Sequence, residues 1–255
     1  MNICVLIKQT FDTEERIAIQ NGKINEEGVE FIINPYDEYA IEEAVQLKEA
    51  QGAIVTVLTV GPARAESALR KALAMGADQA VLIETEDEAI DEYSIAKLIA
   101  AYVKDKGYDL ILGGNMAIDS GSGQVAVRVA EELGIAHVSA VTKLNWDGSK
   151  AIVERDVEGD VEVVEVNLPF LATAQQGLNE PRYPSLPGLM KAKKKPLERL
   201  TIAELGLAQE EWEARTAIRE QYLPARKQAG KILDGDLSQQ VRELVQLLRS
   251  EAKVV

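Results

Sequence analysis

One stretch decides the fold: Asp109-Leu-Ile-Leu-Gly-Gly114-Asn-Met-Ala-Ile-Asp119-Ser-Gly-Ser-Gly123-Gln124. It predicts a short apolar strand, two glycines that would let the backbone approach a ligand, a Gly/Ser-rich loop and a helix. In an open α/β sheet, ligands lie beyond the carboxyl ends of strands. The free N–H groups at a helix start favour an anion there. The stretch indicates a phosphate site, but a capped surface loop remains the alternative, because it matches neither G-x-G-x-x-G nor a P-loop.

The first half of the chain alternates short apolar runs with helical patterns. Strands are expected at 3–7, 53–60, 80–84 and 110–112, and helices at 63–75, 93–104 and 123–133. A further helix follows Asp37, which is expected to cap it. The segment 17–24, with Asn21-Gly22 in its middle, predicts a small hairpin. This alternation favours a parallel sheet with right-handed crossovers.

The pattern changes in the second half. Strand-like segments at 140–145, 151–155, 161–166 and 170–173 are separated by short turns, which is typical of an antiparallel extension of the sheet. An amphipathic helix is expected at 236–252, with Leu237, Val241, Leu244, Val245 and Leu248 on one face. We therefore expect a parallel-sheet α/β domain over 1–195, and a C-terminal arm over 196–255 whose helix packs on its own domain or on a partner chain.

Composition argues against several classes of function. The 255 residues carry 28 basic and 42 acidic side chains, a net charge of −14, which disfavours nucleic acid as a partner. Cys4 and His137 are the only residues of their types, which argues against a disulfide framework, a metal site or a Ser-His-Asp triad. Since no paired nucleophile and base emerge, we expect no catalytic residue. The N-terminus enters a strand pattern without a signal peptide, so a cytoplasmic location is expected.

Two other stretches carry candidate functional residues. Tyr36, within Asn34-Pro35-Tyr36-Asp37, could stack on a planar ligand near the top of the sheet, although a helix cap with packed tyrosines is equally compatible. Leu186 lies in a proline-rich stretch, 178–195, that is expected to be rigid and exposed. Such a leucine is typical of an interface anchor, with a plain surface loop as the alternative. The four lysines that follow form a basic spot on an acidic protein.

Several segments together resemble the beta subunit of electron-transfer flavoprotein. They are Met-Asn-Ile-Cys-Val-Leu-Ile-Lys8, Ile33-Asn-Pro-Tyr-Asp-Glu-Tyr-Ala-Ile-Glu-Glu-Ala-Val45, Arg70-Lys-Ala-Leu-Ala-Met-Gly-Ala-Asp78, Ala117-Ile-Asp119, Val153-Glu-Arg-Asp-Val-Glu-Gly-Asp160 and Leu178-Asn-Glu-Pro-Arg-Tyr-Pro-Ser-Leu-Pro-Gly-Leu-Met-Lys-Ala-Lys-Lys-Lys195. The resemblance covers nearly the whole chain in order, and its last segment is the most specific.

That resemblance implies a Rossmann-like domain that binds an adenine nucleotide. It implies a heterodimer in which an alpha subunit holds most of an FAD and this chain holds a structural AMP. Electrons would pass from acyl-CoA and related dehydrogenases to a membrane quinone oxidoreductase. The implied nucleotide site comprises Leu6, Asn34, Pro35, Tyr36, Asp37, Val60, Gly114, Asn115, Met116, Ala117, Ile118, Asp119, Ser120, Gly121, Ser122, Gly123, Gln124 and Val125. The implied partner-binding residues are Tyr183, Leu186, Pro187 and Met190.

The resemblance assigns further roles and leaves alternatives open. Tyr36 would lie near the flavin ring, Leu186 would anchor the dehydrogenase, and the C-terminal arm would wrap the alpha subunit. One branch of the family performs electron bifurcation with a second FAD in place of AMP, and the loop over 115–126 could serve either ligand. A nucleotide-binding protein of the universal-stress type, which would be a homo-oligomer without flavin, could be built on the same sheet.

Overall fold

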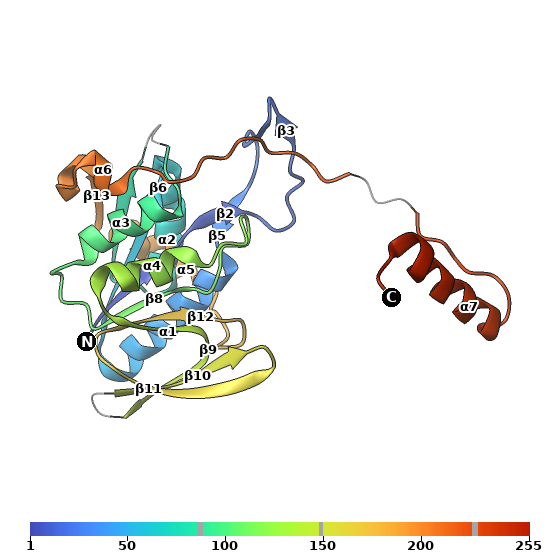
Figure 1. Cartoon of the computed structure of the whole chain (residues 1–255). Helices are drawn as coiled ribbons and strands as arrows, with labels where there is room; N and C mark the ends of the chain where they lie inside the picture. The colour runs from blue at the N-terminus through green and yellow to red at the C-terminus, as the bar shows by residue number, and fades with distance from the viewer. Residues whose placement is uncertain (86–88, 148–149, 226–228) are drawn as a thin grey trace. The chain divides into compact units, whose positions relative to one another are not determined.

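The computed structural model describes residues 1–85, 89–147, 150–225 and 229–255 (Figure 1). The chain divides into two compact units, one of Met1–Ile17 with Glu26–Arg219 and one of Ala18–Asn25 with Glu220–Val255. The boundary expected after residue 195 differs from this division, because β13 (Leu197–Thr201) joins the main sheet by pairing with β7 (Gln79–Glu84).

The core of the first unit is a sheet that, among the described residues, has nine strands in the order β11-β10-β9-β12-β8-β1-β6-β7-β13. The remaining strands of this sheet are β1 (Asn2–Leu6), β6 (Ile54–Gly61), β8 (Leu110–Gly114), β9 (Ala136–Asp147), β10 (Lys150–Val157), β11 (Asp160–Asn167) and β12 (Phe170–Ala174). Strands β1, β6, β7, β8, β12 and β13 pair in parallel, which confirms the parallel α/β sheet. All of their carboxyl ends therefore meet at one edge.

The antiparallel extension is confirmed for β9, β10 and β11 but is wrong for β12. β12 returns from the sheet edge to lie between β9 and β8, parallel to both. All five of its residues are buried. A strand covered on both faces is a continuous apolar run, which is the pattern of parallel strands.

Helices cover both faces of the sheet (Figure 1). Alternate strand residues point to opposite faces, so Ile3 and Val5 pack in one cluster with α1 (Pro35–Gln51) and α2 (Glu66–Met75). Their neighbours on β1 pack in a second cluster with α3 (Glu92–Val103) and α4 (Gln124–Leu133). The other described helical segments of this unit are α5 (Leu186–Ala192), α6 (Gln209–Trp212), η1 (Ala63–Ala65) and η2 (Ile202–Leu205). A short antiparallel pair, β2 (Gln9–Phe11) and β5 (Phe31–Ile33), completes the unit.

The prediction that Asp37 caps the first helix is wrong. Helix α1 begins at Pro35, and Asn34 occupies the cap position without a side-chain capping bond. Proline suits the first helical position, since its missing N–H has no partner there in any helix. Asp37 is thereby moved inside the first turn, where its carboxylate faces the ends of β1 and β8.

The second unit consists of the predicted hairpin and the C-terminal segment. Strands β3 (Ile19–Gln20) and β4 (Lys23–Ile24) form the hairpin, and the Gln221 side chain accepts a hydrogen bond from the Ile24 N–H. Helix α7 (Leu237–Leu247) confirms the predicted amphipathic helix, is capped by Asp236 and continues as a π-helical turn over Leu248–Ala252. Its apolar residues Leu237, Val241 and Leu244 are exposed. No helix in the described part of the chain is long and apolar enough to cross a membrane.

Candidate functional site

A buried carboxylate, Asp37, ties α1 to the carboxyl ends of two strands. Its Oδ2 accepts a hydrogen bond from the backbone N–H of Lys8, just after β1, at 2.6 Å. Its Oδ1 accepts hydrogen bonds from the backbone N–H of Gly114, the last residue of β8, at 3.0 Å and from Asn34 Nδ2 at 2.9 Å. Burial raises the pKa of Asp37 to about 7, against these three donors, which favour the ionised form.

Two asparagine side chains shape the loop that follows β8. Asn34 Nδ2 donates to the Met116 carbonyl at 2.9 Å, and Asn34 Oδ1 accepts from the Ile118 N–H at 3.1 Å. Asn115 Oδ1 accepts from the Thr173 hydroxyl at 3.0 Å. Asn34 at the cap of α1 therefore holds the backbone of the loop, and residues of β12 hold Asn115 through its side chain and its N–H.

The glycines of this loop have different roles. A Cβ on Gly114 would lie 2.2 Å from Asp37 Oδ1 and 2.7 Å from Tyr36 Cβ, so the space left by its absent side chain is filled by the protein. Gly114 is therefore needed for close packing against α1, and its approach to a ligand stays a prediction. Gly121 differs, because its φ is +66° and nothing lies within 4 Å of an added Cβ. The open side of the loop is therefore at Gly121.

A cavity of about 300 Å³ lies beside the loop at the carboxyl edge of the sheet. Two predicted site residues, Val60 and Asp119, line it. Lys8 also lines it, and Lys8 Nζ forms an ion pair with Asp119 Oδ1 at 2.7 Å. Lys8 was not predicted, although its place directly after the first strand, at the edge where all parallel strands end, was the signal that could have found it.

An aromatic wall on the cavity was also missed by the sequence analysis. Phe11 and Phe31 pair across β2 and β5, with ring centroids 5.1 Å apart, and both line the cavity. The Arg64 guanidinium lies 3.8 Å above the Phe31 ring, and Arg64 also pairs with Glu26. The cavity thus combines an aromatic pair with two ion pairs, Lys8–Asp119 and Arg64–Glu26.

Two buried hydroxyls have no hydrogen-bond partner among the described residues. They are Thr10 Oγ1 on the cavity wall and Ser122 Oγ in the loop. A buried polar group without a partner is costly, and a bound water or ligand is one way in which it can be satisfied. Helix α4 begins just after the loop, with Gly123 at its cap and no side-chain capping bond. The loop can therefore bind an anion through backbone N–H groups and a hydroxyl.

The structure places most of the predicted nucleotide-site residues at this edge of the sheet. Several of them, however, pack against the protein and do not line the cavity. Tyr36 is half-buried against Gly114 and does not line the cavity. Leu6 is buried beneath the loop, and Val125 packs α4 on the core. Gln124 accepts hydrogen bonds from Arg128 within α4.

The predicted partner-binding residues lie in or beside the short helix α5. Tyr183, Leu186 and Met190 are 94%, 79% and 75% exposed, and Pro187 occupies the first turn of the helix. Ser185 Oγ caps the helix by accepting from the Gly188 N–H at 3.1 Å. Large apolar side chains exposed this close together are unusual on a protein surface, which makes these residues a candidate interaction site.

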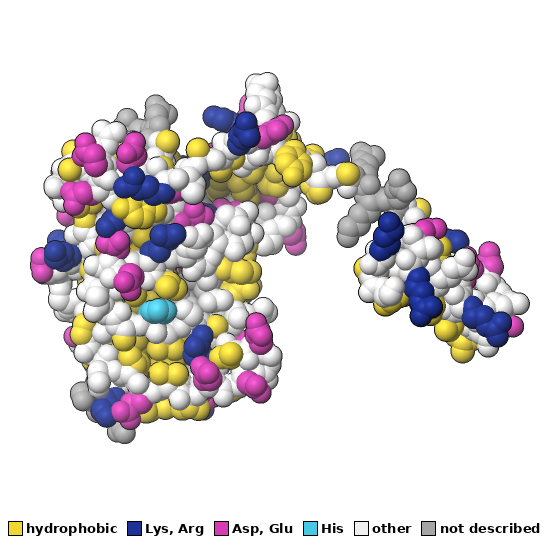
Figure 2. Space-filling model, in the orientation of Figure 1, with side chains coloured by type: hydrophobic (Ala, Val, Ile, Leu, Met, Phe, Trp, Pro, Cys, Tyr) yellow, Lys and Arg dark blue, Asp and Glu magenta, His cyan; other side chains and the backbone are white. Residues whose placement is uncertain are grey.

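The described part of the chain holds no candidate metal site, and its one cysteine is buried. No group of three or more His, Cys, Asp or Glu side chains is placed to hold a metal there. Cys4 is buried in β1, and burial raises the pKa of its thiol, which makes it inert. His137 lies exposed on β9, visible as the cyan side chain in Figure 2.

Comparisons with known proteins identify the family of the chain. Residues 21–205 match the family described as "Electron transfer flavoprotein domain". The chain is 60% identical to the "Electron transfer flavoprotein subunit beta" of Bacillus subtilis (strain 168), over 100% of both chains. It is 40% identical to the protein of that name from Syntrophomonas wolfei, over 100% of this chain and 98% of the relative. The chain therefore belongs to the electron transfer flavoprotein beta subunit family.

Proposed function

We propose that this chain is an electron-carrier subunit that works as a heterodimer with an electron-transfer flavoprotein alpha subunit. The heterodimer takes electrons from acyl-CoA and related flavoprotein dehydrogenases and delivers them to a membrane quinone oxidoreductase, in the cytoplasm and at the membrane surface. The alpha subunit holds most of one FAD, and this chain holds an AMP. The chain itself makes and breaks no bonds, so it is not an enzyme on its own.

The cavity beside the loop is the observation that supports the nucleotide. Its aromatic wall of Phe11 and Phe31 suits an adenine ring, and the open loop at Gly121 with the unpaired Ser122 hydroxyl suits a phosphate. The volume of about 300 Å³ is at the small end of ligand pockets. A mononucleotide is smaller than FAD, so the cavity favours AMP over the second FAD of a bifurcating protein.

FAD, when bound, supplies the one- and two-electron chemistry. The residues of this chain would contribute binding and orientation. Tyr36, held at the first turn of α1 by its packing against Gly114, is the side chain that we propose to lie near the flavin ring. This proposal requires no acid, base or nucleophile in the chain.

Two surfaces suit the two kinds of protein partner. The exposed side chains around α5 (Tyr183, Leu186, Pro187 and Met190) would contact the dehydrogenase, with Leu186 as the anchor. The exposed apolar face of α7 would pack on the alpha subunit, since an amphipathic helix needs a surface on which to bury that face.

Nucleotide analysis of the assembled protein tests the proposal. The chain is coexpressed with an alpha subunit, the heterodimer is denatured, and the released nucleotides are counted. We expect one FAD and one AMP per heterodimer. Two FAD without AMP would establish the bifurcating alternative, and a stable flavin-free homo-oligomer would establish the universal-stress alternative.

A glycine pair tests where the nucleotide lies. Gly121→Glu places bulk and negative charge on the open side of the loop, and we expect AMP to be lost. Gly134→Glu is the matched control, because Gly134 has a similar φ of +64°, equally open space, and a place at the other end of α4. Equal AMP content in the two variants would refute the assignment of the loop.

A further inference from the structure

The recognition segment, residues 179–192, has little regular backbone structure before α5 begins. Among the described residues, no N–H of 179–184 donates to a backbone carbonyl. Pro181 and Pro184 have no N–H to donate. The shape of this segment must therefore be set mainly by side-chain contacts with the elements beneath it.

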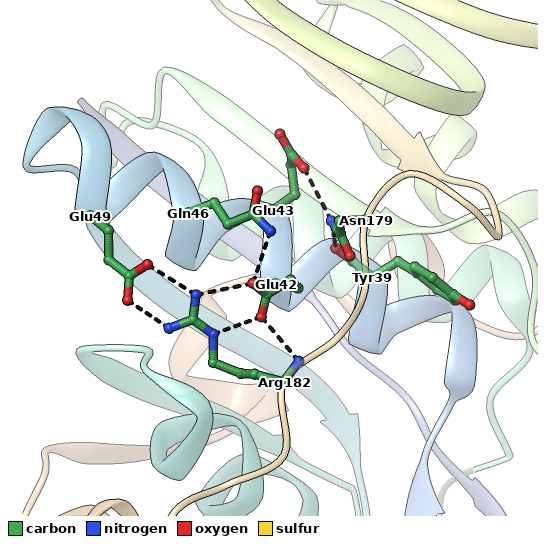
Figure 3. A network of polar contacts seen from close by, with 7 residues as sticks. All are labelled: Tyr39, Glu42, Glu43, Gln46, Glu49, Asn179 and Arg182. Carbon is green, nitrogen blue, oxygen red and sulfur yellow. Dashed lines mark hydrogen bonds and ion pairs between the residues drawn. The ribbon is translucent and has the colours of Figure 1, made fainter.

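Arg182 fastens the segment to α1 through both edges of its guanidinium (Figure 3). Its Nε and Nη2 donate to the two carboxylate oxygens of Glu42, at 2.8 and 3.0 Å. Its Nη1 and Nη2 donate to the two oxygens of Glu49, at 2.6 and 3.0 Å. The backbone N–H of Arg182 also donates to Glu42 Oε2, at 3.2 Å. Bidentate pairs of this kind give both strength and a fixed direction.

Helix α1 holds the carboxylates of Glu42 and Glu49 in position to contact Arg182. Glu42 and Glu49 are seven residues apart, or two helical turns, and so share one face. The Glu42 side chain is 5% exposed, and Gln46 Nε2 donates to its Oε1 at 2.9 Å. Asn179 adds a second attachment, because its Nδ2 donates to the Tyr39 carbonyl and to Glu43 Oε2, both at 3.1 Å (Figure 3).

The far end of the segment is fastened to α2. Arg70 Nη1 donates to the carbonyls of Ala192 and Lys195, at 3.0 and 3.1 Å. Lys195 Nζ donates to carbonyls at the end of α2, so Lys195 does not belong to the basic surface spot expected from the sequence. A Cβ on Gly188 would lie 2.6 Å from the Ala74 carbonyl, which shows how closely α5 approaches α2. Leu186 is thus presented between two fixed ends.

We propose that Arg182 is a positioning residue for partner recognition, which holds Leu186 in the orientation that the dehydrogenase requires. This inference rests on the proposed function. A segment that is ordered before contact loses less conformational freedom on binding, so its affinity is higher. Arg182 acts through Leu186, and lysine cannot replace it, because an ammonium cannot form two bidentate pairs at once.

The test uses the FAD-loaded heterodimer and an acyl-CoA dehydrogenase reduced by its acyl-CoA. In Arg182→Gln we expect the KM for the dehydrogenase to rise about tenfold, the effect of 1.4 kcal/mol. The kcat and the rate of reduction by dithionite should stay unchanged, and Arg182→Lys should not restore the KM. Lys97→Gln is the matched control, since it removes a partly buried ion pair with Glu132 on the other face of the sheet and should leave the KM unchanged.

A double variant separates this inference from the proposed function. Leu186→Ala should raise the KM, and Arg182→Gln with Leu186→Ala should raise it no further, because both changes act through one side chain. A raised KM in Leu186→Ala with an unchanged KM in Arg182→Gln would overturn the role of Arg182 alone. An unchanged KM in Leu186→Ala would overturn the docking surface itself.

A second variant keeps the test decisive if Arg182→Gln does not assemble. Glu49→Gln weakens the guanidinium contact from its exposed side, where the Glu49 side chain is 58% exposed. We expect a KM increase of about threefold, because the Glu42 pair remains. An unchanged KM in this variant would overturn the inference.

Discussion

Asp37→Asn should change how the stability of the protein depends on pH. The pKa of Asp37 is about 7 in the folded chain, because of burial, against 3.8 for a free carboxyl. Between these values the folded state binds more protons than the unfolded state, so the free energy of unfolding falls as pH rises. At 1.36 kcal/mol for each pKa unit, the gap corresponds to about 4 kcal/mol of stability that is present below pH 4 and lost by pH 7.

Asparagine at position 37 removes this titration, but it lowers the free energy of unfolding by an amount that does not depend on pH. The two oxygens of Asp37 receive three N–H donors, and an asparagine amide would turn one of those oxygens into a further donor. A buried donor that faces a donor costs about 1–3 kcal/mol. We therefore expect Asp37→Asn to be less stable than the wild type near pH 5, with the difference shrinking or reversing towards pH 8.

Urea unfolding of the heterodimer, followed at a fixed protein concentration from pH 5 to 8, measures this difference. Asp109→Asn is the control, because Asp109 is a more accessible carboxylate that accepts one backbone N–H, from Asn2 at 2.7 Å. Parallel pH profiles for the wild type and Asp37→Asn would refute the reasoning. The same change of profile in Asp109→Asn would refute its assignment to Asp37.

Three further substitutions probe the site and the arm. Gly114→Ala should destabilise the protein by about 2 kcal/mol or more, since its Cβ would overlap Asp37, whereas Gly61→Ala, with 3.7 Å to Ala65 Cβ, should be tolerated in the same urea assay. Lys8→Met should lower AMP occupancy, while the lost pair with Asp119, which is partly exposed, changes stability by less than about 1 kcal/mol; unchanged occupancy would exclude Lys8 from the site. Leu244→Asp on the exposed face of α7 should weaken the heterodimer in size-exclusion chromatography, and Gln246→Asp should not; equal elution of the two would contradict a role for that face.

The buried half of the sheet could be predicted from the sequence, because parallel strands covered on both faces are continuous apolar runs. The buried residues of β1, β7 and β8 follow this rule, and those of β6 follow it apart from Thr56 and Thr59. β13 does not follow this rule, because it is an edge strand with three exposed residues among its five. Its pairing with β7 is made by backbone hydrogen bonds, which leave no apolar pattern in the sequence. The sequence predicts a strand over 170–173, but the direction of that strand depends on where the chain returns to the sheet.

The candidate site was predictable only where it follows one continuous stretch. The loop after β8 carries its own signal in glycine and serine. The aromatic wall has no such signal in the sequence, because Phe11 and Phe31 are brought together by the pairing of β2 with β5. From the sequence, Asp37 is a typical helix-capping residue. Its hydrogen bonds from the N–H groups of Lys8 and Gly114 depend on β1 and β8 lying side by side, which only the structure shows.

The buried polar contacts of this protein hold segments in place. Asp37 and Asn34 hold the loop beside the cavity, and Arg182 with Glu42 holds the recognition segment. Each is surrounded by partners that satisfy it, whereas a group that exchanges protons with a substrate must face the place where the substrate lies. This arrangement suits a carrier, in which the chemistry belongs to a bound flavin and the protein supplies fixed surfaces. It follows that substitutions in these contacts should change binding and docking before they change any intrinsic rate of electron transfer.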